Sequence, residues 1–334
     1  GGIHMVTLAT AFLSAWLVLL IDNHGRLRHR LLPLFLIVAL CSVGYISQQT
    51  EYTRPDGSTS TVALIQGNIE QNLKWNYEQI SKTSADIIIL PETALPLMRQ
   101  DLPEGILEQF AEQAQSNGSA LAIGISQYTP DGNGYENAVI NLSDYHNSTS
   151  DVIPYYAKNH LVPFGEYKPL PAITERLYKM MDMPLADFQK GGDNQAPLVM
   201  KDQKVAFNIC YEDGFGDELI ATAKRSTLLA NISNMAWYGK SNAMYQQLQQ
   251  SQARAMELGR YMVRATNTGA TAIISPKGTI VAEAQPDTET VLEGHVKGYI
   301  GETPYMKAGG STWLISILTV IGVFLILIGR KKPE

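Results

Sequence analysis

Three long apolar runs lie near the two ends of the chain and enclose a more polar middle region. The first run covers residues 5–21, the second 31–46 and the third 313–329. Each is close to the length of about 20 residues that an α-helix needs to cross roughly 30 Å of hydrocarbon. The hydrophobic pattern therefore predicts three membrane-spanning helices.

Basic residues flank these runs in a consistent way. Arg26, Arg28 and Arg30 stand between the first two runs, and the third run is followed by the basic tail 330–332. Because cytoplasmic loops carry an excess of Lys and Arg, both clusters are predicted to be cytoplasmic, and the middle region extracytoplasmic. A cleaved signal peptide is the alternative for the first run, but neither a strongly basic start nor a small-residue cleavage site accompanies it.

The middle region alternates short apolar runs with amphipathic segments. Ile106, Phe110 and Ala114 repeat at helical spacing, whereas the shorter runs are rich in Val, Ile and Leu and are bounded by Gly, Pro, Asn or Asp. Strand followed by helix recurs, which favours a layered α/β sandwich over a β-barrel. The expected strands are 61–66, 86–90, 120–126, 137–142, 204–209, 227–232, 271–274 and 279–284, and the expected helices are 106–115, 216–224 and 242–263.

These patterns divide the chain into a globular middle and membrane-embedded ends. The region between the second and third apolar runs is long enough for one sizeable domain, and no internal repeat interrupts it. The expected division is two membrane helices with a basic cytoplasmic loop in 1–48, a linker in 49–60, one α/β domain in 61–300, a linker in 301–312, and a last membrane helix with its basic tail in 313–334.

Composition limits which partners, metal sites and disulfides the chain can have. The formal net charge is −6 and basic residues are scattered, which excludes a nucleic-acid partner because no basic stripe exists to neutralise phosphates. The six histidines are dispersed and cysteines are not paired, so no metal site is expected. Of the two cysteines, Cys41 falls in the second apolar run and Cys210 in the middle region, so they cannot form a disulfide. An unpaired thiol outside the cytoplasm is a liability unless it is buried or used.

Three reactive residues each follow an apolar run: Glu92, Lys158 and Cys210. A carboxylate, an amine and a thiol are the components of a cysteine acyl-transfer site, because a thiol becomes a strong nucleophile only with a nearby cation or a base. Lys158 can be the cation and Glu92 the base that later returns the proton to the leaving group. The Lys158 ammonium and the Tyr211 amide can stabilise the oxyanion.

Two further carboxylates accompany this set. Glu166 and Glu212 each lie a few residues from a proposed catalytic group and can hold Lys158 charged or orient it. Taken singly, a cysteine such as Cys210 is usually a small buried apolar residue, and a lysine such as Lys158 is usually on the surface. Their joint appearance, each after an apolar run and beside Pro or Gly turns, is what favours a catalytic site.

The segments around these residues resemble the nitrilase, or carbon–nitrogen hydrolase, superfamily and, more narrowly, the bacterial apolipoprotein N-acyltransferases. The resemblance covers about residues 61–300, and the apolar ends fit the same family. About eight membrane spans are typical of that family, so we expect the printed sequence to lack the first several. The motifs that carry the resemblance lie at 90–96, 158–167, 210–212, 231–239, 252–260 and 264–269.

The resemblance implies a nitrilase-like αββα sandwich flanked by transmembrane helices, with Glu92, Lys158 and Cys210 as catalytic triad. In that family the thiolate takes an acyl chain from a membrane phospholipid as a thioester and passes it to the amine of a diacylglyceryl-cysteine lipoprotein. The reaction takes place at the bacterial inner membrane, on its periplasmic face, without cofactor. The supporting residues implied by the family are Glu166, Tyr211 and Glu212.

Large aromatic residues are the candidates for substrate contact. The family's loop tryptophan corresponds to Trp75, and Trp237 and Tyr238 are amphipathic aromatics in another predicted loop. A methionine cluster in 180–183 can contact acyl chains or serve as ordinary packing. Two other functions stay open at this point: a membrane-anchored nitrilase-type amidase or hydrolase, in which water resolves the acyl-cysteine, and an inert membrane-binding module that retains the fold.

Overall fold

The computed structural model divides the chain into two compact units. The central unit is residues 55–300, and the terminal unit combines residues 1–54 with 301–334. The structure describes residues 2–22, 27–68, 73–143, 145, 153–170 and 187–329.

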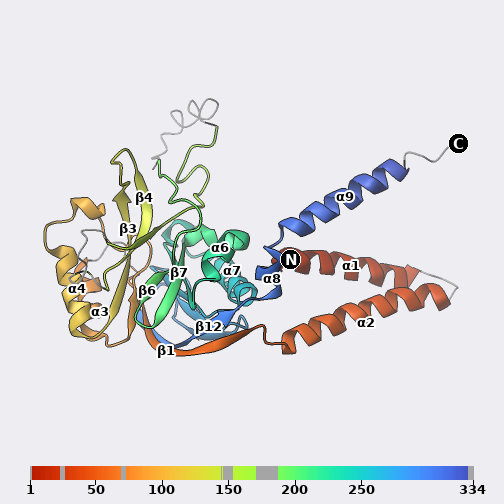
Figure 1. Ribbon diagram of the computed structural model, residues 1–334, viewed down its shortest axis with the longest axis horizontal. Helices are drawn as coiled ribbons and strands as arrows, with labels where there is room; N and C mark the ends of the chain where they lie inside the picture. The colour runs from red at the N-terminus through yellow and green to blue at the C-terminus, as the bar shows by residue number, and fades with distance from the viewer. Residues whose placement is uncertain are drawn as a thin grey trace. The chain divides into compact units, whose positions relative to one another are not determined.

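Two six-stranded sheets form the middle of the central unit (Figure 1). The first has the order β12-β1-β2-β3-β4-β5, with β1, β2 and β3 parallel and β3, β4 and β5 antiparallel. The second has the order β11-β10-β9-β8-β7-β6, with β7, β8 and β9 parallel. The first sheet comprises β1 (Thr53–Gln66), β2 (Ile87–Ile89), β3 (Ala120–Tyr128), β4 (Tyr135–Asn141), β5 (Tyr155–Ala157) and β12 (Thr290–Gly301). The second comprises β6 (Leu198–Met200), β7 (Gln203–Ile209), β8 (Leu228–Ser233), β9 (Met262–Thr266), β10 (Ala272–Ile274) and β11 (Ile280–Glu283).

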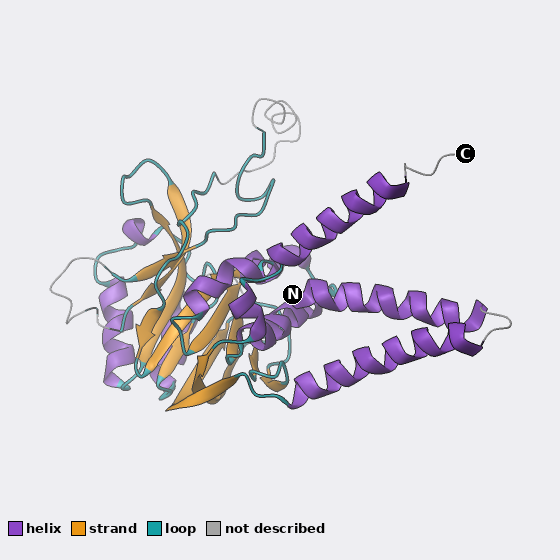
Figure 2. Ribbon diagram, turned by 45° about the vertical axis from the view of Figure 1, so that its right-hand side comes forward, coloured by secondary structure: helices purple, strands orange, loops and turns teal. Residues whose placement is uncertain are grey.

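Helices cover the outer face of each sheet, which gives the four layers of an αββα sandwich (Figures 1 and 2). On the first sheet, α3 (Leu73–Lys82) and α4 (Ile106–Ser116) pack through Ile80 and Phe110. On the second, α6 (Gly216–Ala223) contacts β7, and α7 (Ala243–Leu258) contacts β9 and β10. The predicted α/β sandwich is confirmed.

The apolar runs of the sequence explain this layering. Along β1, Val62 and Leu64 point into the cluster between the sheets, whereas Ala63 and Ile65 point into the cluster under α3 and α4. A strand exposes successive side chains on opposite faces, so a strand covered on both faces must be apolar at every position. That is why this strand reads as a continuous apolar run and not as an alternation.

Two predicted boundaries are wrong by several residues. The helix expected over 242–263 ends at Leu258, because Gly259 adopts the left-handed conformation (φ 62°) that commonly terminates a helix. The chain then enters β9, whose five residues are all buried. In addition, β1 begins at Thr53, eight residues ahead of the expected strand. The short strands β5 and β6, the exposed strand β12 and helix α3 are further elements that the pattern did not predict.

The terminal unit is helical. It contains α1 (Gly2–Asp22), α2 (Leu27–Gln49), α8 (Pro304–Ala308) and α9 (Thr312–Gly329). Two apolar stretches, Gly2–Ile21 and Leu31–Gln49, are long enough to cross a membrane, and almost none of their residues are buried. For α9, side chains are described only as far as Val323, so the prediction that this helix crosses a membrane stays a prediction. The side chains of the two basic clusters lie outside the described residues.

Candidate active site

The ends of three strands bring Glu92, Lys158 and Cys210 together. Lys158 directly follows β5, Cys210 directly follows β7, and Glu92 lies three residues beyond β2. Lys158 Nζ is 3.7 Å from Glu92 Oε1. The charges of Glu92 and Lys158 both act on the Cys210 thiol and shift its pKa. The three residues singled out from the sequence therefore share one site.

Lys158 is held as a buried cation. Its side chain is 1% exposed, and its Nζ donates a 2.7 Å hydrogen bond to Glu166 Oε1. Burial alone would lower the pKa of Lys158, but the negative charges of Glu92 and Glu166, together with the charge that Cys210 carries when it is ionised, outweigh burial and raise the pKa above its usual value. Glu166 thus contacts Lys158 directly, and its Oε2 accepts from the Val162 N–H at 2.8 Å.

Glu92 is fixed by two asparagines that the sequence reasoning did not single out. Its Oε1 accepts from Asn137 Nδ2 at 2.6 Å, and its Oε2 accepts from the backbone N–H of Asn234 at 2.7 Å. The carboxylate is 7% exposed. Asn234 lies inside the motif 231–239, so a signal for it was present, whereas Asn137 was only the first residue of an expected strand.

Cys210 begins the short 3₁₀ helix η2 (Cys210–Gly214) in an unusual backbone conformation. Its φ is +53°, a left-handed conformation that residues with a side chain seldom adopt and that the surrounding structure must hold in place. Burial and the Glu92 carboxylate raise the pKa of the thiol to about 12, against the opposing effects of Lys158 and Arg264. A pKa this high keeps the resting sulfur protonated at neutral pH.

Glu212 joins the loops that carry Lys158 and Cys210. Its carboxylate accepts from the backbone N–H groups of Ile209 (2.7 Å), Asn159 (2.7 Å) and His160 (3.0 Å), and from the Tyr156 hydroxyl (3.0 Å). Burial raises the pKa of Glu212 to about 7, although these backbone hydrogen bonds act to lower it. Glu212 therefore orients the backbone on either side of the site.

The aromatic candidates have different environments. Trp237 and Tyr238 lie on the 3₁₀ helix η3 (Ala236–Tyr238) and are 87% and 51% exposed. Tyr211 is also exposed. Trp75 was expected in a loop, but it lies on α3, whose apolar face packs on the first sheet, and its ring contacts that cluster. The methionine cluster in 180–183 lies outside the described residues.

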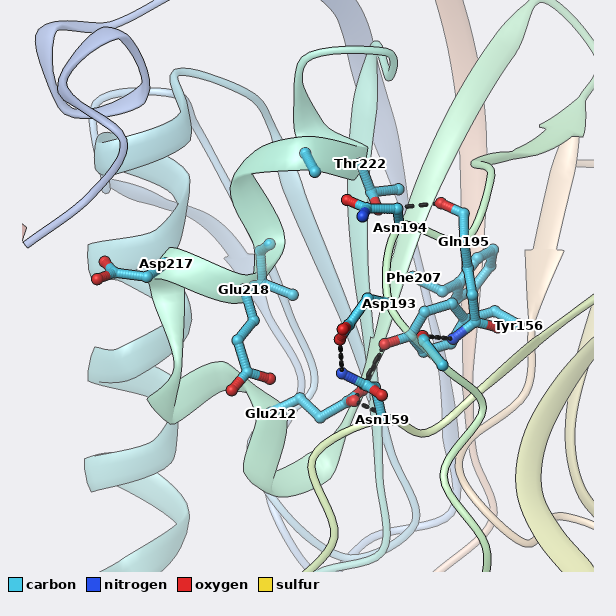
Figure 3. A pocket seen from close by; sticks show the side chains of 13 residues that line it. Tyr156, Asn159, Asp193, Asn194, Gln195, Phe207, Glu212, Asp217, Glu218 and Thr222 are labelled. Carbon is cyan, nitrogen blue, oxygen red and sulfur yellow. Dashed lines mark hydrogen bonds between the residues drawn. The ribbon is translucent and has the colours of Figure 1, made fainter. Parts of the chain in front are cut away.

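A cavity of about 240 Å³ lies beside Glu212, and Asn159, Asp193 and Glu218 also line it (Figure 3). Its lining includes neither Cys210 nor Lys158. The cavity is therefore not the chamber in which the sulfur reacts. Among the described residues, no group of three or more His, Cys, Asp or Glu side chains is arranged to hold a metal ion.

The carbon–nitrogen hydrolase family model matches residues 61–305, and similarity to known proteins extends over the whole chain. An apolipoprotein N-acyltransferase from Neisseria meningitidis serogroup A is 72% identical over an alignment of 343 positions, which covers 99% of this chain and 67% of that protein. The chain belongs to the apolipoprotein N-acyltransferases of the carbon–nitrogen hydrolase family. The family expected from the motifs is thereby confirmed, and the chain is an enzyme of the acyltransferase class.

Other relatives support the same membership. An apolipoprotein N-acyltransferase from Chromobacterium violaceum is 47% identical, with 100% of this chain and 65% of that protein covered. The chain thus spans about two thirds of the length of these relatives. Among solved structures, an amidase from Nesterenkonia has a TM-score of 0.53 at 19% identity, covering 75% of this chain and 93% of that one. A carbon–nitrogen hydrolase from Helicobacter pylori has a TM-score of 0.52 at 15% identity, covering 75% and 91%. These two likenesses show the fold.

Proposed function

We propose that this chain transfers an acyl chain from a membrane phospholipid, through a thioester at Cys210, to the α-amine of a diacylglyceryl-cysteine at a lipoprotein N-terminus. The observation that carries the proposal is the buried Lys158 ammonium, which lies between the carboxylates of Glu92 and Glu166 and acts electrostatically on the Cys210 thiol. Family membership supplies the reaction class, and the length and apolar composition of α1 and α2 support a membrane location.

The first half-reaction forms the thioester. Glu92 takes the proton of the Cys210 thiol as the sulfur attacks the ester carbonyl of the phospholipid. The carbonyl oxygen becomes an oxyanion, which the Lys158 ammonium and the Tyr211 N–H stabilise. When the tetrahedral intermediate collapses, the ester C–O bond breaks and Glu92 returns the proton to the departing lysophospholipid alkoxide. The enzyme then carries the acyl group on sulfur and an ionised Glu92.

The second half-reaction uses the same groups in the same order. The lipoprotein amine attacks the thioester carbonyl, and Glu92 takes a proton from the nitrogen. Collapse breaks the C–S bond, forms the amide and releases the Cys210 thiolate, which regains its proton from Glu92. Lys158 stabilises both the oxyanion and the departing thiolate, because its buried charge stays within reach of each.

The location follows from the same proposal. The substrates are lipids, so the site must open toward a bilayer, and the exposed Trp237 and Tyr238 are suited to the interface between apolar chains and water. Trp75 is proposed to act on the substrate side of the site, although it is partly buried against the apolar cluster under α3 and α4. We place the enzyme in the bacterial inner membrane as a multi-pass protein, with the central unit on the periplasmic face.

The choice of acceptor tests this function. The purified chain is incubated in detergent with phospholipid and a synthetic diacylated lipopeptide, and products are separated by mass spectrometry. Acyl transfer predicts a triacylated lipopeptide that forms with the parent chain and with Cys41→Ser, but not with Cys210→Ser. Release of free fatty acid alone contradicts the transferase and favours a hydrolase. A folded chain that yields neither product is an inert binding module.

A further inference from the structure

One amide side chain reaches the reacting sulfur from the helical layer. Gln247 lies on α7 and is 9% exposed, and its Nε2 is 3.8 Å from Cys210 Sγ. The same Nε2 is 3.5 Å from the hydroxyl oxygen of Ser233 on β8. An N–H group at that distance from sulfur is a donor to it, and a donor stabilises a thiolate more strongly than a thiol.

The direction of this amide is determined by its other end. Arg264 on β9 donates from its terminal NH2 to Gln247 Oε1 at 2.7 Å. A guanidinium carries only donors, so the oxygen of the amide must face Arg264 and its NH2 group must face away. The Gln247 NH2 is thereby directed at Cys210. The inverted amide would place two donors against each other in a buried site.

Arg264 is itself immobilised. It is fully buried and donates to Asp213 Oδ2 at 3.1 Å and to Asn231 Oδ1 at 2.6 Å. Asp213 belongs to η2, the same short helix that begins with Cys210. The contacts therefore form a closed path that leaves η2 at Asp213, passes through Arg264 and Gln247, and returns to η2 at the sulfur. Such a path fixes the distance between the amide and the thiol.

We propose that Gln247 is a catalytic residue that donates a hydrogen bond to the Cys210 thiolate, and that Arg264 is the positioning residue that directs it. The inference deepens the proposed function, since it takes Cys210 as the nucleophile. The thiolate forms when Glu92 removes the proton and again when the thioester breaks. Lys158 must stabilise the oxyanion and the thiolate at those moments, so a neutral donor on the sulfur adds to what the one cation supplies.

Reactivity of the thiol toward iodoacetamide, followed from pH 7 to 10, tests the inference. Every variant carries Cys41→Ser, so that Cys210 is the only thiol left to react with iodoacetamide. Gln247→Leu removes the donor and should slow alkylation at pH 8 about tenfold, which corresponds to one unit in the pKa of the thiol. Gln247→Glu keeps the shape and the bond to Arg264 but presents a carboxylate oxygen to the sulfur, so alkylation should slow further. The control is Gln249→Leu, the same change at an exposed position of the same helix.

The result that overturns the inference is a pair of folded Gln247 variants with the alkylation profile of the Gln249→Leu control. Because Gln247→Glu retains the contact with Arg264, it stays informative if Gln247→Leu fails to fold. Alkylation needs no lipid and no acceptor. A failure of acyl transfer in the parent chain therefore leaves this measurement intact, and the two proposals can fail separately.

Discussion

The chemistry of Cys210 depends on how three nearby charges balance. Two carboxylates, Glu92 and Glu166, lie against the single ammonium of Lys158, so the cation is largely neutralised within the site. Less of its field is left to lower the pKa of the thiol, and burial raises that pKa to about 12. The site is therefore built for proton removal during attack and not for a standing thiolate, unlike thiols activated by a single neighbouring cation.

This balance predicts an unusual pH profile at the residue scale. Since the thiol stays protonated over the accessible range, the alkylation rate of Cys210 in the Cys41→Ser chain should rise about tenfold per pH unit from pH 7 to 10 without levelling off. An ordinary cysteine levels off once pH exceeds its pKa of about 8.5. Iodoacetamide kinetics measure the profile. A plateau below pH 8 would show a preformed thiolate and contradict the general-base role of Glu92.

At the scale of elements, the site depends on the close approach of β3 to the loop that carries Glu92. Gly124 lies in β3, and a Cβ added there would lie 2.2 Å from the Pro91 carbonyl oxygen and 2.7 Å from the Glu92 Cα. No side chain fits in that space. The absence of a Cβ in one strand thus fixes how near the catalytic carboxylate lies to the sheet.

Gly124→Ala should therefore displace Glu92 while leaving most of the sandwich intact. We expect acyl transfer to fall about 10²-fold, because a shift of roughly 1 Å in a catalytic group is sufficient for a loss of that size. Turnover is measured beside thermal unfolding to confirm that the variant is folded. The control is Gly214→Ala, where nothing lies within 4 Å of the added Cβ. Equal turnover in both variants would refute the role assigned to this approach.

The elements also show what the sequence could predict. The proposed triad could be predicted because each member follows an apolar run, and runs buried on both faces leave a plain signal, as at β2 and β7. The end of α7 was mistaken because helical apolar spacing continues past Gly259, where backbone conformation and not hydrophobicity ends the helix. Asn137 and Gln247 were missed because each acts through a contact with a residue more than 30 positions away, which no local pattern records.

At the scale of the whole molecule, the distribution of charge relative to the apolar ends determines which side of the membrane the site faces. The two basic clusters flank the apolar segments, and the net charge of the chain is −6. The positive-inside rule predicts that both clusters face the cytoplasm and that the central unit faces the periplasm. The lipoprotein acceptor would then meet the enzyme after export.

Single cysteines test this topology. In a chain with Cys41→Ser and Cys210→Ser, Lys277→Cys introduces a thiol at an exposed turn of the central unit, and Arg26→Cys introduces one in the basic loop. A membrane-impermeant maleimide should label position 277 but not position 26 in intact spheroplasts, and the reverse in inverted vesicles. Labelling of position 26 in intact spheroplasts would contradict the assigned orientation.

The central claim is that the sulfur of Cys210 carries the acyl group between the two substrates. Intact-mass analysis of the purified chain after exposure to phospholipid alone, followed by peptide mapping, tests it directly. The account predicts a mass increase of one acyl group, located at Cys210, absent from Cys210→Ser, retained in Cys41→Ser and discharged when the diacylated lipopeptide is added. An unmodified Cys210 in a chain that still acylates the lipopeptide, or the same adduct in Cys210→Ser, would contradict it.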